Sequence, residues 1–198
     1  IKRLLGVVIP PGGTHTSMGT HNLLMRLSNS TFLEVIAINP DLPGPSQPRW
    51  YGLDNPDVQS RLKVQPSLLT WVINTDDIHE RMQNASISFG NPQKIHRGTL
   101  NWCFGLPGDG RLLASGFVPY LIQWESAEHP AAAMPFSDCS LESLTLYHTN
   151  PDWLNSVLKS VGAAHLVTVK PLIKRTRAYM IASIRTPNGI KELHSLEK

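Results

Sequence analysis

Cysteine is scarce in this chain, and its scarcity excludes several structural classes. The chain has two cysteines among 198 residues, and Cys103 and Cys139 lie too far apart in the sequence for a zinc ribbon or a redox CxxC motif. Two cysteines are also weak support for the disulfide framework of a small secreted domain. The composition therefore favours a protein of the reducing cytoplasm.

Long apolar runs are absent as well. No stretch approaches the roughly 20 apolar residues that span a bilayer, and the first residues do not resemble a signal peptide. We therefore expect no membrane partner. Residues 1–8 lack an initiator methionine and resemble the last turn of a helix that Gly6 closes, so we expect native sequence upstream of Ile1.

Positive charge is thinly spread. The 18 Lys and Arg residues stand against 15 Asp and Glu residues, which gives a formal net charge of +3. The basic cluster at residues 170–177 is interrupted by Pro171, Leu172 and Ile173, and the Trp residues lie apart from it. A nucleic-acid-binding face usually interleaves cations with stacking aromatics. We predict no nucleic-acid partner and interpret the cluster as a solvated loop.

Motifs of several enzyme classes are also missing. The sequence has no Gly-x-Ser-x-Gly elbow, no recognisable Ser/His/Asp triad motif and no phosphate-cradling glycine loop ahead of a helix. These absences argue against a hydrolase and against a nucleotide-binding protein. With 41% hydrophobic residues, the chain can nevertheless bury a substantial core.

The most informative segment that is present comprises residues 10–22. Its sequence, Pro-Pro-Gly-Gly-Thr-His-Thr-Ser-Met-Gly-Thr-His-Asn, predicts sharp turns, because Gly accepts positive φ and Pro fixes φ. It places His15 and His21 close to two apolar strands, of which the second carries a lone acid, Glu34. Two imidazoles near a carboxylate suit a metal site or an acid/base site. A tight polar connection between strands is the alternative interpretation.

Alternation and turn residues predict the order of the elements. We expect a β-hairpin at residues 22–28 and 31–38, followed by a long ordered loop at 39–66, which holds six Pro residues. A strand at 68–75 and a helix at 78–85, capped by the pair Asp76-Asp77, come next. The remaining predicted elements are strands 100–106, 118–124 and 141–148, helix 152–161, and strands 166–169, 178–185 and 190–193.

The order strand, helix, then further strands occurs twice, which indicates an internal repeat. Aligning residues 70–77 with 145–152 places a Thr first and an Asp last in both segments. The opening segment resembles a third copy without its first strand and most of its helix. We therefore predict an incomplete unit with the Pro-rich loop at residues 1–66, a second unit at 67–128, and a linker with a third unit at 129–198.

Several short motifs follow one another along residues 1–150. They are Gly12-Gly13-Thr14-His15, Gly19-Thr20-His21-Asn22, Phe32-Leu33-Glu34-Val35-Ile36-Ala37, Arg49-Trp50, Trp71 with Thr75-Asp76-Asp77, Pro107-Gly-Asp-Gly, and Pro119-Tyr-Leu-Ile-Gln-Trp124. In this order they resemble the glyoxalase-like domain family of the vicinal oxygen chelate superfamily. The resemblance implies an α+β fold of repeated βαβββ units, whose curved mixed sheets form a β-cup with helices on the outside.

The resemblance also implies a divalent metal, such as Mn, Fe, Ni or Zn, that chelates two neighbouring substrate oxygens and stabilises an enolate-like charge. In such sites a His from the first strand and a Glu from the last strand of each unit hold the metal. Glu34 matches a last-strand ligand, but Gln123 stands at the equivalent place in the second unit. Thr70 and Thr145 occupy the first-strand positions.

The candidate site residues follow from these motifs. Glu34 and His21 are the predicted catalytic residues and also the predicted metal ligands. The predicted ligand-binding residues are His15, Asn22, Arg49, Trp50, Trp71, Trp102 and Gln123. For each of them a structural role is the alternative. The His residues would then stabilise their loop by hydrogen bonds, Arg49 would stack on Trp50, and the Trp residues would belong to the core.

Three functions remain open from the sequence. The leading hypothesis is a glyoxalase-like protein that binds a small oxygen-rich molecule in the β-cup, and that acts as a metal-assisted lyase or isomerase if a missing first strand completes the ligand set. The alternative is a non-catalytic protein that sequesters a drug or metabolite between aromatic walls, which the Trp residues and Gln123 favour. The third is a structural subunit, such as a homo-oligomer paired through its sheet edges.

Overall fold

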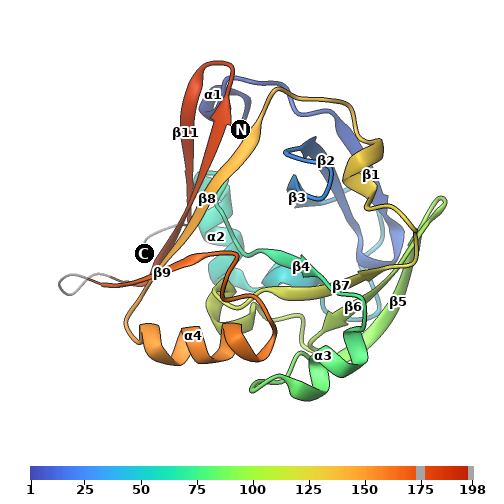
Figure 1. Cartoon of the computed structure of the whole chain (residues 1–198). Coiled ribbons are helices and arrows are strands. Elements are labelled where there is room, and N and C mark those ends of the chain that lie inside the picture. Colours follow the sequence, from blue (N-terminus) through green and yellow to red (C-terminus); the bar gives the residue numbers. More distant parts are fainter. Residues whose placement is uncertain (173–176, 196–198) are drawn as a thin grey trace.

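The computed structural model describes residues 1–172 and 177–195 and contains helices and three β-sheets (Figure 1). The helices are α1 (Lys2–Leu5), α2 (Pro56–Val64), α3 (Ile78–Asn84) and α4 (Pro151–Ser160). The strands are β1 (Pro11–His15), β2 (Thr20–Arg26), β3 (Phe32–Ile38), β4 (Val72–Asn74), β5 (Asn91–Arg97), β6 (Leu100–Leu106), β7 (Tyr120–Trp124), β8 (Ser140–His148), β9 (Thr168–Pro171), β10 (Tyr179–Thr186) and β11 (Gly189–His194). The predicted α+β class is confirmed.

The first sheet has the order β1-β2-β3 with antiparallel pairing throughout. The hairpin of β2 and β3 was predicted at nearly these bounds. Ahead of it, α1 ends at Gly6, whose left-handed φ of 74° closes the helix as the sequence predicts. Asn188 Nδ2 donates to the carbonyl of Gly6 at 3.2 Å, which ties α1 to the turn between β10 and β11.

The second sheet has the order β4-β7-β6-β5, in which β4 runs parallel to β7. Helix α3 begins at the predicted cap, where the Asp77 side chain accepts from the amide of Glu80 at 2.9 Å. Strand β5 was not predicted. Its Asn-Pro start and its Gln, Lys, His and Arg residues hide the alternation by which strands are usually identified.

The third sheet has the order β11-β10-β8-β9, so that β8 lies between β9 and β10. The element order of the second sheet recurs here, but its first strand β4 lies at an edge, whereas β8 is internal. The predicted alignment of residues 70–77 with 145–152 does not hold at its last position. Asp77 caps α3, but Asn150 caps α4 and Asp152 lies in the first turn of that helix.

The segment at residues 39–66 contains α2, so the prediction that it lacks a regular element was wrong. The side chain of Asn55 accepts from the amides of Asp57 and Val58, and Pro56 follows it at the start of the helix. Proline is well accommodated at that first position, because its missing N–H would have no partner there. The high proline content of the segment masked this start signal.

The three sheets share one continuous hydrophobic core, to which Met25, Ile73, Phe104, Leu146 and Met180 contribute. Each sheet takes its strands from one of the three predicted segments, while the domain boundaries themselves stay predictions.

Both cysteines are free, and no helix among the described residues is long and apolar enough to cross a membrane. The cytoplasmic location stays a prediction. Half of the predicted basic cluster at residues 170–177, namely residues 173–176, lies outside the described part of the chain.

Candidate functional site

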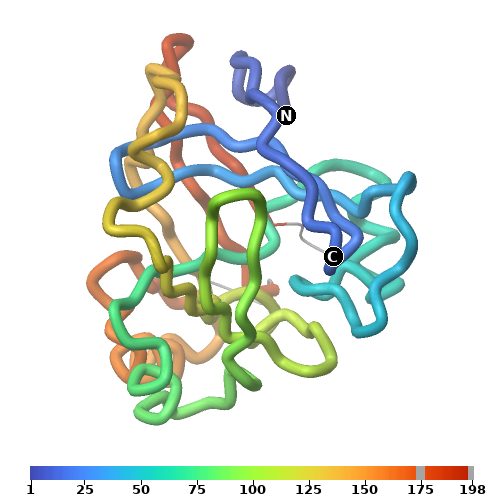
Figure 2. Tube along the Cα trace, turned by 90° about the vertical axis from the view of Figure 1, so that its right-hand side faces the viewer, coloured from blue at the N-terminus to red at the C-terminus, as the bar shows by residue number. Residues whose placement is uncertain are grey.

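Five polar side chains from the first two sheets meet among aromatic rings, and we call them the polar cluster. Asn22 Nδ2 donates to Glu34 Oε1 at 2.5 Å. Arg97 Nη1 lies 3.0 Å from His15 Nε2 and 3.4 Å from Asn22 Oδ1. His15 Nδ1 lies 3.1 Å from Thr20 Oγ1. Arg97 ends β5, so the polar cluster joins the β5–β6 hairpin to β1 and β2. In the chain trace of Figure 2, this hairpin lies near the N-terminal strands.

Strand pairing decides which side chains enter the polar cluster. Asn22 lies opposite Ile36, and Leu24 lies opposite Glu34. Because successive side chains of a strand point to opposite faces, Asn22 and Glu34 lie on the same face of the first sheet. His15 lies opposite Thr20, which is two residues before Asn22 and therefore shares that face.

Two glycines of β1 make room for the polar cluster. A β-carbon on Gly12 would overlap Asn22 Oδ1 and would lie 2.6 Å from Leu24 Cγ. A β-carbon on Gly13 would lie 3.3 Å from Arg97 Cδ. The pairing of β1 with β2 also shifts its register between Pro11 and Gly13, as at a β-bulge. The Gly-Gly pair thus lets the side chains of Asn22 and Arg97 lie against the backbone of β1.

His15 is uncharged at neutral pH. Its ring is buried, and this burial, together with the nearby charge of Arg97, lowers its pKa to about 4. A guanidinium has donors but no acceptor, so His15 Nε2 accepts from Arg97. The proton of the neutral ring therefore lies on Nδ1, from which it is donated to Thr20 Oγ1.

Glu34 is the acid of the polar cluster. The side chain is half-buried, and desolvation by the surrounding protein raises the pKa of its carboxyl, against the opposing effects of the Asn22 hydrogen bond and the Arg97 charge. Tyr51 lies nearby, since the charge of Glu34 adds to the effect of burial in raising the pKa of the Tyr51 phenol. A carboxyl with a raised pKa is suited to proton transfer near neutral pH.

Aromatic side chains surround the polar cluster. The His15 ring makes edge contacts with Trp50 at 4.9 Å and with Trp102 at 6.4 Å, measured between ring centroids. Trp124 packs on Trp102 at 5.3 Å. The indole Nε1 atoms of Trp50 and Trp124 are buried, and neither has a hydrogen-bond partner among the described residues. One unpartnered donor, on Trp50, thus lies next to His15, and a second, on Trp124, lies beyond Trp102.

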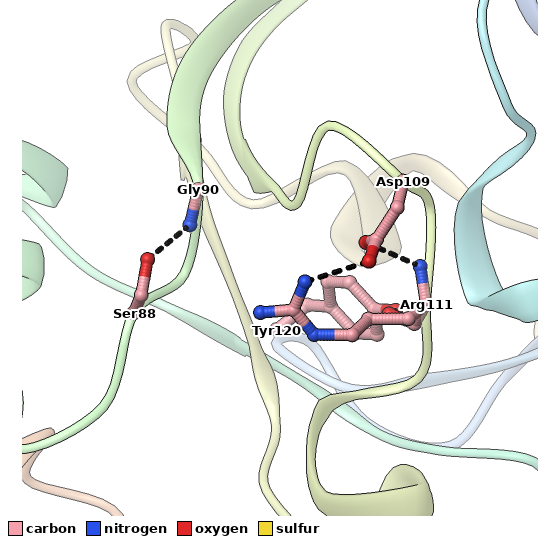
Figure 3. A network of polar contacts seen from close by, with 5 residues as sticks. All are labelled: Ser88, Gly90, Asp109, Arg111 and Tyr120. Carbon is pink, nitrogen blue, oxygen red and sulfur yellow. Dashed lines mark hydrogen bonds and ion pairs between the residues drawn. The ribbon is translucent and has the colours of Figure 1, made fainter.

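Trp50 and Tyr51 reach this position through a turn on the second sheet. The amide of Gly52 donates to the carbonyl of Gly110 at 2.7 Å. Asp109 fixes the turn itself by accepting from the amide and from Nη1 of Arg111 (Figure 3). The Tyr120 hydroxyl donates to the Arg111 carbonyl at 2.6 Å. Tyr51 has a φ of 60°, a left-handed conformation that costs free energy in a non-glycine residue.

Comparison with known protein families identifies the family of the chain. The family model described as glyoxalase-like domain matches residues 1–162. The chain belongs to the glyoxalase-like domain family. The resemblance predicted from the motifs is therefore confirmed, and it extends beyond residue 150, where the quoted motifs end.

The glyoxalase-like fold also has a counterpart among solved structures. The crystal structure of a hypothetical protein from Staphylococcus aureus is similar over 95% of this chain and 76% of its own chain, with a TM-score of 0.55 and 14% sequence identity. At this identity the similarity supports the fold alone. No curated protein matches the sequence.

Five of the predicted site residues of this glyoxalase-like domain come together. They are Glu34, His15, Asn22, Trp50 and Trp102. Their motifs lie in different strands and in the loop after β3, so the fold, not their spacing in the sequence, unites them.

His21 does not join the polar cluster. It lies between Thr20 and Asn22 in β2 and is exposed, whereas its two neighbours are buried. The two-residue period of a strand places its side chain on the opposite face of the sheet from Glu34. The structure therefore does not bring together the two predicted metal ligands, His21 and Glu34.

Gln123 also faces away from Glu34. Its Oε1 accepts from the amide of Ile78 at 3.0 Å, and its Nε2 donates to the carbonyl of Asp76 at 2.9 Å. Gln123 thus fixes the start of α3 on the far side of β7. The sequence places Gln123 at the position equivalent to Glu34, but its side chain points away from the polar cluster to which Glu34 belongs.

Trp71 and Arg49 make structural contacts elsewhere. Trp71 Nε1 donates to the carbonyl of Phe117 at 3.1 Å, which fixes the segment leading into β4. Arg49 Nη1 forms an ion pair with Asp54 Oδ1 at 2.6 Å. Arg49 also lines a separate open cleft of about 860 Å³. Arg49 therefore pairs with Asp54, whereas the sequence predicted that it binds the ligand.

Arg97 and Tyr51 are two residues of this region that sequence reasoning missed, and Thr20 and Trp124 were also not among the predicted site residues. Arg97 lies in the unpredicted strand β5, just before the Gly98 turn, and Tyr51 follows Trp50 in the motif already quoted. An isolated basic residue at the end of a polar strand is usually solvent-exposed, so no local signal distinguishes Arg97. Its role depends on the approach of two sheets.

The donor set of the described residues does not fit the divalent metal that the family resemblance implies. Within residues 1–172 and 177–195, no group of three His, Cys, Asp or Glu side chains is placed to hold a metal ion. Arg97 also takes the lone pairs of His15 Nε2 and Asn22 Oδ1. A catalytic divalent site usually has three protein ligands. The polar cluster offers one, the carboxylate of Glu34.

Proposed function

We propose that this glyoxalase-like domain binds a small oxygen-rich molecule at the polar cluster, between the sheets of β1–β3 and β4–β7. The observation that carries the proposal is the chain of contacts from Glu34 through Asn22 to Arg97 and His15. Polar and charged groups cost free energy when they are taken out of water, and aromatic neighbours do not compensate for that cost. A binding site accounts for their presence better than a core does.

The unpartnered indoles support the same proposal. Trp50 Nε1 and Trp124 Nε1 are donors, and a buried donor without an acceptor costs about 1–3 kcal/mol. An oxygen-rich ligand supplies acceptors. Ligand sites in proteins typically combine aromatic walls with a few polar groups in this way.

Tryptophan fluorescence tests the proposal directly, because Trp50 and Trp102 contact His15. The protein is titrated with short diols, hydroxy acids, keto acids and diketones, first with EDTA and then with Mn²⁺, Fe²⁺, Ni²⁺ or Zn²⁺. We expect at least one compound to change the emission. Replacing Asn22 by Leu should lower the affinity for that compound roughly tenfold, as the loss of a hydrogen bond to a charged group implies.

Two controls accompany the titration. Trp153 lies on α4 and is exposed, so Trp153→Phe should leave the ligand-induced change intact, whereas Trp102→Phe should diminish it. The proposal fails if no oxygen-rich compound binds, with or without a metal. It also fails if Asn22→Leu binds the compound as well as the original protein does.

Proton transfer by Glu34 is a second candidate function, and it corresponds to the lyase or isomerase chemistry of the leading sequence hypothesis. The raised pKa of the Glu34 carboxyl favours it, since such a group can accept a proton from carbon next to a polarised carbonyl. In heavy water, a bound keto acid should then exchange the hydrogen next to its carbonyl, as proton NMR would show. Exchange that continues unchanged in Glu34→Gln would exclude Glu34 as the base.

A further inference from the structure

Arg97 is a half-buried cation without a salt bridge. No described carboxylate lies within 4.0 Å of its guanidinium. Only Nη1 makes hydrogen bonds to the described residues, to neutral His15 and to Asn22. Nε and Nη2 have no described partner. Charged groups that leave bulk water are usually paired, so the guanidinium has capacity for an anion.

The rest of the site also offers more donors than acceptors. The unpartnered Nε1 atoms of Trp50 and Trp124 are two further donors. Glu34 is the opposing group: Oε1 accepts from Asn22, whereas Oε2 makes no hydrogen bond to the described residues. The complementary ligand therefore has several acceptor oxygens for the donors and one hydroxyl for Glu34.

We propose that Arg97 is the resident cation of this site and that the site binds a small carboxylate bearing a hydroxyl group. This inference rests on the proposed function and names its ligand class. The planar guanidinium matches the two oxygens of a carboxylate. The carboxylate of Glu34 opposes ligands with two negative charges, so a monoanion is favoured over inorganic phosphate.

Calorimetric titration with glycolate provides the test, because glycolate carries one carboxylate and one hydroxyl. Glycolamide lacks the charge and acetate lacks the hydroxyl, while inorganic phosphate tests for a general oxyanion site. All titrations contain EDTA. We expect glycolate to bind at least tenfold more tightly than glycolamide, and more tightly than acetate or phosphate.

Variants of Arg97 assign the binding to the guanidinium. Arg97→Gln should weaken glycolate at least tenfold, and Arg97→Lys should recover part of the affinity, because an ammonium supplies charge without the planar fork. Lys94→Gln is the matched control. Lys94 lies on the same strand and is exposed, so its replacement removes the same charge and should leave the affinity within about twofold. Thermal unfolding verifies that each variant is folded, and Arg97→Lys serves as the decisive comparison if Arg97→Gln is not.

Other outcomes overturn the inference. Equal affinity for glycolate and glycolamide would show that the guanidinium does not select the ligand. The same conclusion would follow if Arg97→Gln or Arg97→Lys bound glycolate as tightly as the original protein does. Glycolate binding that appears only after Mn²⁺ or Zn²⁺ replaces EDTA would return the cation role to a metal. If neutral diols bind and carboxylates do not, this inference fails while the proposed function stands. If no oxygen-rich compound binds, both fail.

Discussion

The side-chain oxygen of Asn22 lies where a β-carbon on Gly12 would have to be. Asn22 cannot easily move away, because it donates to Glu34 and lies 3.4 Å from Arg97 Nη1. The glycine of β1 and the amide of β2 are therefore mutually dependent. The Gly-Gly motif thus matters to the candidate site, because a side chain at Gly12 would take the space that Asn22 needs.

Gly12→Ala should destabilise the protein and disturb the site together. Overpacking typically costs about 1–3 kcal/mol, and displacement of Asn22 would break its contact with Glu34. Urea unfolding measures the loss, and the ligand titration measures the damage to the site. Gly108→Ala is the control, since a β-carbon there would have no neighbour within 4 Å. Equal stability of the two variants would contradict the crowding at Gly12.

His15 should make the fold acid-sensitive. The unfolded chain protonates His15 near 6.5 and the folded chain only near 4, so the unfolded state binds more protons between these values. The free energy of unfolding therefore falls as the pH drops from 6.5 to 4, by about 3 kcal/mol in total. Denaturant titrations at several pH values should show that the free energy of unfolding depends less steeply on pH in His15→Gln. The exposed neighbour His21 supplies the control, His21→Gln, which should keep the slope of the original protein.

Glu34 should have the opposite pH dependence. Its folded pKa lies above the ordinary 4.5, so the folded state binds more protons between 4.5 and that raised value. The contribution of Glu34 to stability is most favourable below 4.5 and declines as the pH rises through the folded pKa. Glu34→Gln should remove this decline and be at least as stable as the original protein at pH 8. Glu125→Gln, at an exposed position, should change neither the slope nor the stability. A steeper decline in Glu34→Gln would be inconsistent with a desolvated carboxyl.

Ser115→Gly should stabilise the protein by about 1 kcal/mol. Ser115 is exposed and has a φ of 58°, which costs free energy in a residue with a β-carbon and little in glycine. Chemical denaturation provides the measurement. Ser46 is also exposed and is not among the residues with positive φ, so Ser46→Gly should instead lose stability through the greater freedom of the unfolded chain. The same sign for both variants would refute the strain at Ser115.

Gln123→Ala should affect α3 and not the ligand. It removes the acceptor of the Ile78 amide and the donor to the Asp76 carbonyl, at a cost of about 1–2 kcal/mol by analogy with helix caps. Gln83→Ala is the control, since Gln83 is an exposed residue of the same helix and Ala favours helices. Ligand affinity should be unchanged in both. A selective loss of affinity in Gln123→Ala would restore its predicted binding role.

Much of the fold could be predicted from local patterns. The β2–β3 hairpin, the cap of α3 at Asp77 and the closure of α1 at Gly6 each depend on residues adjacent in the sequence. Strand β5 and helix α2 were missed for an equally local reason, because polar residues in one and prolines around the other obscured the usual signals. The sheet order around β8 was beyond reach, since pairing between distant strands has no signature in either strand alone.

The family and the α+β class could be predicted from the sequence, because they depend on motifs, and the lone acid in an apolar strand indicated Glu34 as a candidate site residue. The residues that accompany Glu34 depend instead on how the strands pair and how the sheets pack. A shift of one position along β2 separates Asn22, which contacts Glu34, from His21, which faces the other way. Arg97 joins from another sheet, far along the chain. Side-chain direction in a strand alternates at every residue. A motif therefore indicates the strand, whereas packing determines which face of that strand lines the site.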